Sequence, residues 1–128
     1  MYAEGGLPRA DRELGALAAS QVNGCRYCAN VHARQHIRLS GSSDVIAALW
    51  TEDRAALSAR DAAIVTFAEA LTATPPNADK SHIAALKAAG LEPFEIIDLI
   101  HAIAIFGWAN RLMHPLGHSD NEDKRTAP

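Results

Sequence analysis

The stretch from about Pro93 to Met113 constrains the fold of this chain most strongly, because its apolar residues spread around more than one face of the helix it predicts. Gly90 precedes the stretch and Pro115 follows it, as is typical of helix boundaries. A six-helix monomer of this size offers too little surface to cover such a helix on several sides. We therefore expect a homo-oligomer with this helix central or at the subunit interface. The apolar residues are Phe94, Ile96, Ile97, Leu99, Ile100, Ile103, Ile105, Phe106 and Trp108.

The rest of the composition also favours helices. The chain has 128 residues, which suits one domain with a modest core. Its residues are 48% hydrophobic, many of them alanine, and only 5% aromatic. Alanine-rich sequence with few β-branched runs is typical of packed helices. The sequence therefore predicts an all-α fold, a compact six-helix domain.

Glycine, proline and serine clusters divide the chain into its predicted elements. The clearest breaks are Asn23-Gly24, Ser40-Gly41 and Thr74-Pro75-Pro76-Asn77. The pattern Ser58-x-x-Asp61 resembles a capping box at a helix start. We expect a flexible lead-in at residues 1–8, a helical domain at 9–117 and a polar, largely disordered tail at 118–128. The predicted helices cover about 9–22, 26–39, 44–50, 59–72, 78–89 and 93–113.

Charge and hydropathy exclude several kinds of partner. The formal net charge is -3, which gives no sign of a nucleic-acid partner. Charges and glycines between Met1 and Arg12 take the place of the apolar segment of a signal peptide. No uninterrupted apolar run reaches the roughly 18 residues that a membrane span needs. We expect a cytoplasmic protein without a membrane partner, where a close cysteine pair is catalytic or binds metal.

The chemistry of the chain concentrates at Cys25, Cys28 and His32. If this segment is helical, its spacing places the three side chains on one face. Gly24 marks a helix start, where unpaired N–H groups favour a thiolate. An imidazole one turn on can move a proton near neutral pH. A second cysteine can capture an oxidised sulfur as a disulfide.

Other interpretations of these residues remain open at this point. The two cysteines can be buried small hydrophobes, or they can bind zinc together with His32. Glu13 lies in the first turn of its predicted helix, where an acid simply complements the helix dipole. His36 suits a supporting or exposed position as well as a reactive one. We interpret His101 as a packed or supporting histidine.

The segment 13–36, ELGALAASQVNGCRYCANVHARQH, resembles the active-site pattern of the alkylhydroperoxidase D-like family, also called the carboxymuconolactone decarboxylase-like family. The shared features are Glu13, the step to Cys25, and Cys-x-x-Cys-x-x-x-His. Near the other end, Asn110-Arg111 and Leu116-Gly117 look like the ending of the peroxidase-related branch. The decarboxylase branch shares the fold but lacks the cysteine pair, which argues against lactone decarboxylation here.

The resemblance implies a helical fold that forms homotrimers or homohexamers, with a peroxide-reducing dithiol site. By position, Cys28 would be the attacking thiol, Cys25 the resolving thiol, and Glu13 and His32 the proton relay. The helix dipole alone would instead favour Cys25 as the more thiolate-like sulfur. Tyr27 stands where the best-known peroxidases of the family have a second histidine, so the relay here has one imidazole fewer.

We therefore expect a peroxidase-like thiol oxidoreductase that reduces hydroperoxides with its cysteine pair. The sequence holds no GxGxxG and no GxxxxGK[ST] motif, so we expect no bound cofactor. An external dithiol, carried by a lipoyl-bearing or thioredoxin-like protein, would restore the reduced state. The alternatives are a zinc protein using Cys25, Cys28, His32 and Glu13 or a neighbouring subunit's residue, and a disulfide reductase or redox sensor of the same fold.

Overall fold

The computed structural model describes residues 5–117, and within this range the chain forms six α-helices, one 3-10 turn and no strand. The predicted all-α class is therefore confirmed. Residues 1–4 of the expected lead-in and the expected tail at 118–128 lie outside the described residues. The elements are α1 (Arg9–Val22), α2 (Arg26–Ser40), α3 (Asp44–Trp50), the 3-10 turn (Arg54–Ala56), α4 (Ala59–Thr72), α5 (Lys80–Ala88) and α6 (Pro93–Leu116).

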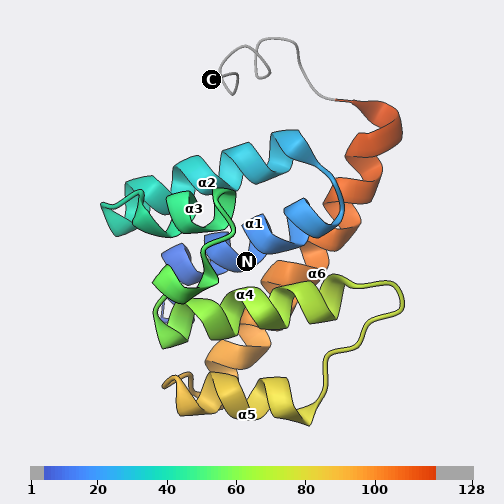
Figure 1. Cartoon of the computed structure of the whole chain (residues 1–128). Coiled ribbons are helices and arrows are strands. Elements are labelled where there is room, and N and C mark those ends of the chain that lie inside the picture. The colour runs from blue at the N-terminus through green and yellow to red at the C-terminus, as the bar shows by residue number, and fades with distance from the viewer. Residues whose placement is uncertain (1–4, 118–128) are drawn as a thin grey trace.

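Helix α1 is the centre of the fold. It lies between α2 and α4 and also packs against α6 (Figure 1). Every residue from Arg12 to Ser20 is buried, on all sides of the helix. Gly15 allows the close approach of α6, because a Cβ atom there would lie 2.8 Å from Leu99 Cδ1. The most enclosed helix is thus the alanine-rich α1, whose small side chains let three helices approach it.

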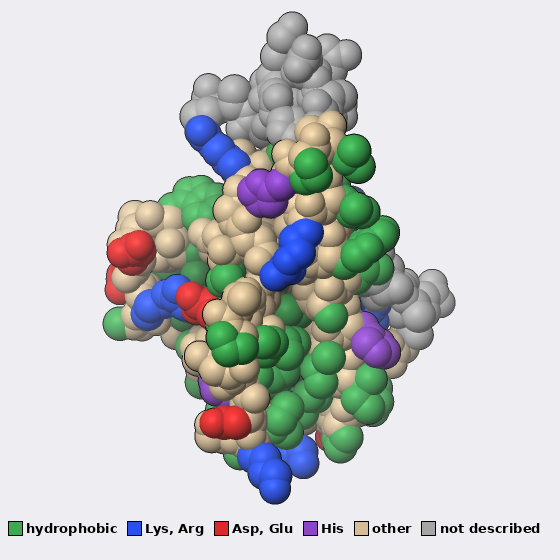
Figure 2. Space-filling model, turned by 90° about the vertical axis from the view of Figure 1, so that its right-hand side faces the viewer, with side chains coloured by type: hydrophobic (Ala, Val, Ile, Leu, Met, Phe, Trp, Pro, Cys, Tyr) green, Lys and Arg blue, Asp and Glu red, His purple; other side chains and the backbone are tan. Residues whose placement is uncertain are grey.

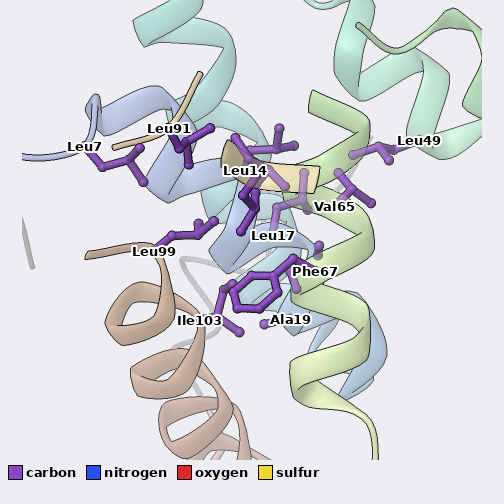
Figure 3. Packing of buried hydrophobic residues seen from close by; sticks show 14 of the residues in the cluster. Leu7, Leu14, Leu17, Ala19, Leu49, Val65, Phe67, Leu91, Leu99 and Ile103 are labelled. Atoms are coloured by element: carbon purple, nitrogen blue, oxygen red, sulfur yellow. The ribbon is translucent and has the colours of Figure 1, made fainter. Parts of the chain in front are cut away.

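The hydrophobic core fills the space between α1, α4 and α6 (Figure 3). Leucine and isoleucine side chains from these helices are almost completely shielded from solvent. Leu7, which precedes α1, joins this core, and its backbone N–H donates to Asp98 Oδ2 at 2.9 Å. Large members of the core are Leu7, Leu14, Leu17, Ile64, Val65, Phe67, Leu86, Leu91, Leu99 and Ile103.

Helix α6 contributes only one of its faces to this core. Leu99, Ala102 and Ile103 are buried, whereas Ile97 and Trp108 are 54% and 62% exposed. Figure 2 shows hydrophobic side chains gathered on the side of the molecule where the end of this helix lies. Within residues 5–117, α6 is also the helix long and apolar enough to cross a membrane, by length and composition alone. Apolar residues of α6 thus lie on its buried face and on its exposed face, as the sequence predicts.

Several helix ends follow the sequence prediction. Gly41 ends α2 with a φ of 76°, the left-handed conformation that glycine adopts without strain. Ser58 Oγ accepts a hydrogen bond from the Asp61 N–H at 3.1 Å at the start of α4. Pro115, however, lies inside the last turn of α6, which continues to Leu116. The Gly117 N–H then closes that turn on the Met113 carbonyl at 2.8 Å.

Three predicted inward-facing residues lie elsewhere. Trp50 is 48% exposed because it is the last residue of α3, and Val22 is 44% exposed at the end of α1. His82 caps α5 instead, where its Nδ1 accepts a hydrogen bond from the Asp79 N–H at 3.1 Å. His101 is exposed in the single chain and lies on the same stripe of α6 as Ile97 and Ile105. The interpretation of His101 as a packed or supporting histidine therefore stays a prediction, because this stripe is also exposed and apolar.

Candidate active site

The two cysteines lie at the start of α2 and form a disulfide. Gly24 precedes them with a φ of 68°, which allows the sharp turn between α1 and α2. Cys25 is the N-cap residue, so it precedes the helix, and Cys28 lies in the first turn. Their Cα atoms are 5.4 Å apart, and both residues are buried. The Cys28 N–H also donates to Cys25 Sγ at 3.4 Å, as the cap position favours.

A buried acid and a buried histidine form an ion pair or a neutral hydrogen bond beside this disulfide. Glu13 Oε2 of α1 and His32 Nδ1 of α2 are 2.6 Å apart. Phe106 of α6 packs edge-on against the His32 ring, with 4.1 Å between the ring centres. Glu13 fixes the orientation of the imidazole through Nδ1, which leaves Nε2 as the nitrogen for other contacts. Both predicted relay residues are thus held together by three helices.

Cys28 opens into the same cavity as this acid–histidine pair. The cavity has a volume of about 330 Å³ and includes Glu13, Cys28 and His32 in its lining. Cys28 Sγ also lies 3.2 Å from the Met113 sulfur of α6. Three of the four predicted site residues therefore meet at one hollow. Further lining residues are Arg9, Tyr27, Val31, Gln35, Phe106 and Met113.

Cys25 lines a different cavity. The expectation that Cys25, Cys28 and His32 share one helix face was wrong for Cys25. Helix α2 begins only at Arg26, and the ψ of Cys25 is 89°, which is not helical. Its cavity is larger, about 610 Å³, and Trp50 of α3 forms part of the lining. The remaining lining residues are Ser20, Gln21, Gly24, Arg26, Ala29 and Asn30.

A polar network from α6 holds the turn that carries the disulfide. Asn110 is fully buried; its side-chain nitrogen donates to Ser20 Oγ at 3.2 Å, and its oxygen accepts from the Asn23 amide at 3.2 Å. His114 Nε2 lies 2.7 Å from the Asn23 carbonyl oxygen. The Cys25 N–H donates to the Ser20 carbonyl at 3.0 Å. These bonds fix the position at which α2 starts.

His36 is buried one turn beyond His32, outside both cavity linings. Burial lowers the pKa of His36 below its usual 6.5, and the carboxylates of Asp61, Asp11 and Glu13 oppose this shift only in part. Its Nδ1 has no hydrogen-bond partner among residues 5–117. We therefore assign His36 to the interior of the fold, as a histidine that stays neutral when buried.

The metal-binding alternative finds little geometric support. In the described part of the chain, no three or more histidine, cysteine, aspartate or glutamate side chains are grouped so that they could hold a metal ion. Glu13 Oε2 already engages His32 Nδ1, and Cys25 and Cys28 are paired with each other.

Sequence reasoning missed the contribution of α6 to the site. Phe106 and Met113 looked like core or interface residues, because nothing in an apolar helix distinguishes a residue that lines a reactive cavity. Asn110 carried a usable signal. A single amide within an apolar helix needs a buried partner, and it was noted only as part of a family pattern.

Comparisons with known proteins identify a family pattern in the first part of the chain. No curated protein matches the chain. The family model described as "Carboxymuconolactone decarboxylase family" matches residues 1–56, which include Glu13, both cysteines, His32 and His36. The resemblance inferred from the sequence is thus confirmed over this segment: residues 1–56 carry the pattern of the carboxymuconolactone decarboxylase family.

Proposed function

We propose that the protein is a peroxidase-like thiol oxidoreductase that reduces hydroperoxides with Cys28 and Cys25. The observation that carries the proposal is the shared cavity of Cys28 and the Glu13–His32 pair. A sulfur that attacks a peroxide needs to lose a proton first, and the departing oxygen needs to gain one. An imidazole held by a buried carboxylate supplies both functions next to Cys28.

The reaction begins from the reduced protein. The Cys28 thiolate attacks one oxygen of the O–O bond, which breaks and leaves Cys28 as a sulfenic acid. The other oxygen leaves as an alcohol after accepting a proton from the relay of His32 and Glu13. The Cys25 thiol then attacks the Cys28 sulfur, water leaves, and the disulfide forms. Their 5.4 Å Cα separation is compatible with this last step.

An external dithiol completes the cycle by reducing the disulfide. We propose a lipoyl-bearing or thioredoxin-like protein as its source, because the sequence has no motif for a bound redox cofactor. The same disulfide also suits a disulfide reductase or redox sensor. The two activities differ in their oxidant: a hydroperoxide oxidises a peroxidase faster than a small disulfide does, and the order is reversed for a reductase.

The test is a thiol titration of the reduced protein before and after one equivalent of cumene hydroperoxide, combined with intact-mass measurement. The proposal predicts the loss of two thiols and two hydrogens, reversible by a dithiol. An unchanged thiol count would contradict it. A mass increase of one oxygen, with no disulfide formed, would contradict the role of Cys25 as the resolving thiol.

We also propose that the protein is a homo-oligomer, a trimer or hexamer, formed through the exposed apolar face of α6. Ile97, Ile105 and Trp108 are 54%, 45% and 62% exposed, and Phe94, Leu112 and Leu116 extend the same helix surface. Exposed apolar surface of this kind is typical of an interface. Multi-angle light scattering should give a trimer or hexamer, and Trp108→Glu should shift it toward monomer. A monomeric unmodified protein would contradict the assembly.

A further inference from the structure

The two cysteines of the disulfide line two separate cavities on opposite faces of α2. Arg26 and Asn30 line the cavity of Cys25, whereas Val31 and Gln35 line the cavity of Cys28. At about 100° of rotation per residue, the first pair points away from the second. The helix itself therefore separates the two spaces. Each sulfur can meet a different reactant.

The chemistry of the two cavities differs as well. The lining of the Cys28 cavity includes Glu13 and His32, which can exchange protons. Among residues 5–117, the side chains that line the Cys25 cavity include no carboxylate and no imidazole, and the charged one is the exposed Arg26. The nearby His114 imidazole is engaged with the Asn23 carbonyl. A positive charge there favours an incoming thiolate, which is the nucleophile of thiol–disulfide exchange. Trp50 adds a wide apolar surface beside the same space.

We propose that the Cys25 cavity is the entry site for the external dithiol, which attacks Cys25 Sγ, while the hydroperoxide reaches Cys28 through the other cavity. The volume of about 610 Å³ suits a small dithiol, or a dithiol on a narrow arm, better than the face of a folded protein. This inference rests on the proposed peroxidase cycle, in which reduction of the disulfide follows its formation by the peroxide. The site itself is a property of the disulfide and is tested separately.

Reduction from this side proceeds in two balanced steps. The thiolate of the external dithiol forms a bond to Cys25 Sγ, the Cys25–Cys28 bond breaks, and Cys28 leaves as a thiolate. The second thiol of the reductant, after losing its proton, attacks the reductant's own sulfur in the mixed disulfide. It becomes a cyclic disulfide and releases Cys25 as a thiolate. Two electrons pass from the dithiol to the protein.

This direction of attack returns Cys28 to the place where it reacts. The leaving Cys28 thiolate appears beside the His32–Glu13 pair, which is the cavity assigned to the peroxide. Attack on Cys28 would instead place the reductant between Cys28 and Met113, whose sulfur lies 3.2 Å from Cys28 Sγ. The arrangement therefore lets both reactants use the site without crossing each other's path.

The direct test identifies which sulfur is attacked. The unmodified protein, oxidised to its disulfide with diamide, is mixed briefly with 2-mercaptoethanol and quenched with N-ethylmaleimide. Trypsin cleaves after Arg26, which places Cys25 in peptide 13–26 and Cys28 in peptide 27–34. The proposal predicts the mercaptoethanol adduct on 13–26 and maleimide on 27–34. The reverse pattern, or adducts shared equally by both peptides, would overturn it.

A matched pair of variants tests the cavities themselves. Asn30→Trp fills the Cys25 cavity, and Gln35→Trp fills the Cys28 cavity from the opposite face of the same helix. We expect Asn30→Trp to slow reduction by dithiothreitol about tenfold, with oxidation by cumene hydroperoxide changed less than about twofold. Gln35→Trp should show the opposite pattern. Equal effects of the two variants on reduction would overturn the proposal.

The failure of this inference can be told from the failure of the peroxidase cycle. If cumene hydroperoxide does not oxidise the reduced protein, the cycle is wrong, yet diamide still provides the disulfide for the adduct measurement. If peroxide oxidises the protein but the adduct appears on Cys28, the cycle stands and the assignment of the Cys25 cavity is wrong.

Discussion

The two sides of the disulfide differ more than their shared position at the start of α2 suggests. On the Cys28 side, Glu13 and His32 lie 2.6 Å apart, both buried, and Phe106 packs against the imidazole. On the Cys25 side, the cavity contains amides, an arginine and an exposed tryptophan. One side can move protons, and the other offers space and a positive charge. A single bond thus joins two environments suited to different reactants.

The difference follows from where each cysteine stands relative to the helix. Cys28 is inside α2, so the residues three and four positions further on, Val31 and His32, share its face. Cys25 is the N-cap, so it precedes the helix, and the cavity that it lines also includes residues from the end of α1 and from α3. In a Cys-x-x-Cys pair at a helix start, the first cysteine precedes the helix and the second lies in its first turn. This difference in position alone gives the two cysteines unequal surroundings.

The largest expected effect comes from removing each sulfur separately. Cys28→Ser should abolish reaction with cumene hydroperoxide, because the remaining Cys25 lies outside the cavity with the relay. Cys25→Ser should also stop turnover, but Cys28 should still react once and stay as a sulfenic acid. Dimedone labelling followed by intact-mass measurement distinguishes the two outcomes.

The same pair of variants can show whether the two sulfurs have the opposite roles. Stoichiometric dimedone labelling of Cys28→Ser, with none in Cys25→Ser, would exchange the roles of the two sulfurs. That result would favour the helix-dipole argument, since Cys25 Sγ accepts the Cys28 N–H at the helix start. Circular dichroism of both variants shows whether each remains folded.

The second effect comes from the carboxylate behind the imidazole. Glu13→Gln keeps the size of the side chain but replaces the carboxylate beside His32 Nδ1 with a neutral amide. We expect oxidation by hydroperoxide to slow by about 100-fold, within the usual range for general acid–base groups. Reduction by dithiothreitol should change far less, because the Cys25 cavity does not include Glu13. The matched control is Glu69→Gln, since Glu69 pairs with Arg54 on the surface.

Two results of the rate measurements on Glu13→Gln would contradict this prediction. If Glu13→Gln and Glu69→Gln oxidise at the same rate, the buried pair has no part in proton transfer. If Glu13→Gln slows oxidation and reduction alike, the proton relay serves both sulfurs, and the chemical difference between the two sides disappears.

Much of the fold and part of the site were predictable from the sequence. Glycine and proline breaks placed all six helices to within about three residues, because glycine and proline restrict the local backbone. Glu13 and His32 were identified together through a family pattern, whereas the dipole argument alone treats an acid in a first turn as ordinary. The contact between them depends on how α1 packs on α2, which periodicity does not specify.

The rest depended on tertiary packing. Trp50 and His101 looked inward from their apolar surroundings, yet both are exposed in the single chain. The burial of His36 and of Asn110 follows from the close packing of α1 against its neighbours, which no single helix reveals. The separation of the two cavities likewise depends on whether α2 begins at Cys25 or one residue later, at Arg26. Sequence patterns do not predict helix boundaries to one residue.

A smaller effect, on stability, should come from the amide that holds the turn before Cys25. Asn110→Ala removes both hydrogen bonds of that side chain and leaves Ser20 and Asn23 without them in a buried region. We expect a loss of about 1–3 kcal/mol in the free energy of unfolding. Urea denaturation measures it, with Thr51→Ala, at an exposed hydroxyl on the helix end, as control. Equal stability of the two variants would show that the network does not hold the turn.

The smallest effect separates His36 from the histidine of the relay. The pKa of His36 is lowered in the folded protein by burial, while the unfolded chain takes up a proton near 6.5. Between these two pKa values the unfolded state binds more protons than the folded state. The free energy of unfolding therefore falls as the pH is lowered below about 6.5, by at most about 1.4 kcal/mol per pH unit. His36→Leu removes the contribution of His36 to this pH dependence. Urea denaturation at several pH values should therefore show a flatter acid limb for His36→Leu, whereas Lys87→Ala, at an exposed site on α5, should keep the original slope. An unchanged slope in His36→Leu would show that the lowered pKa of His36 does not cause the acid sensitivity.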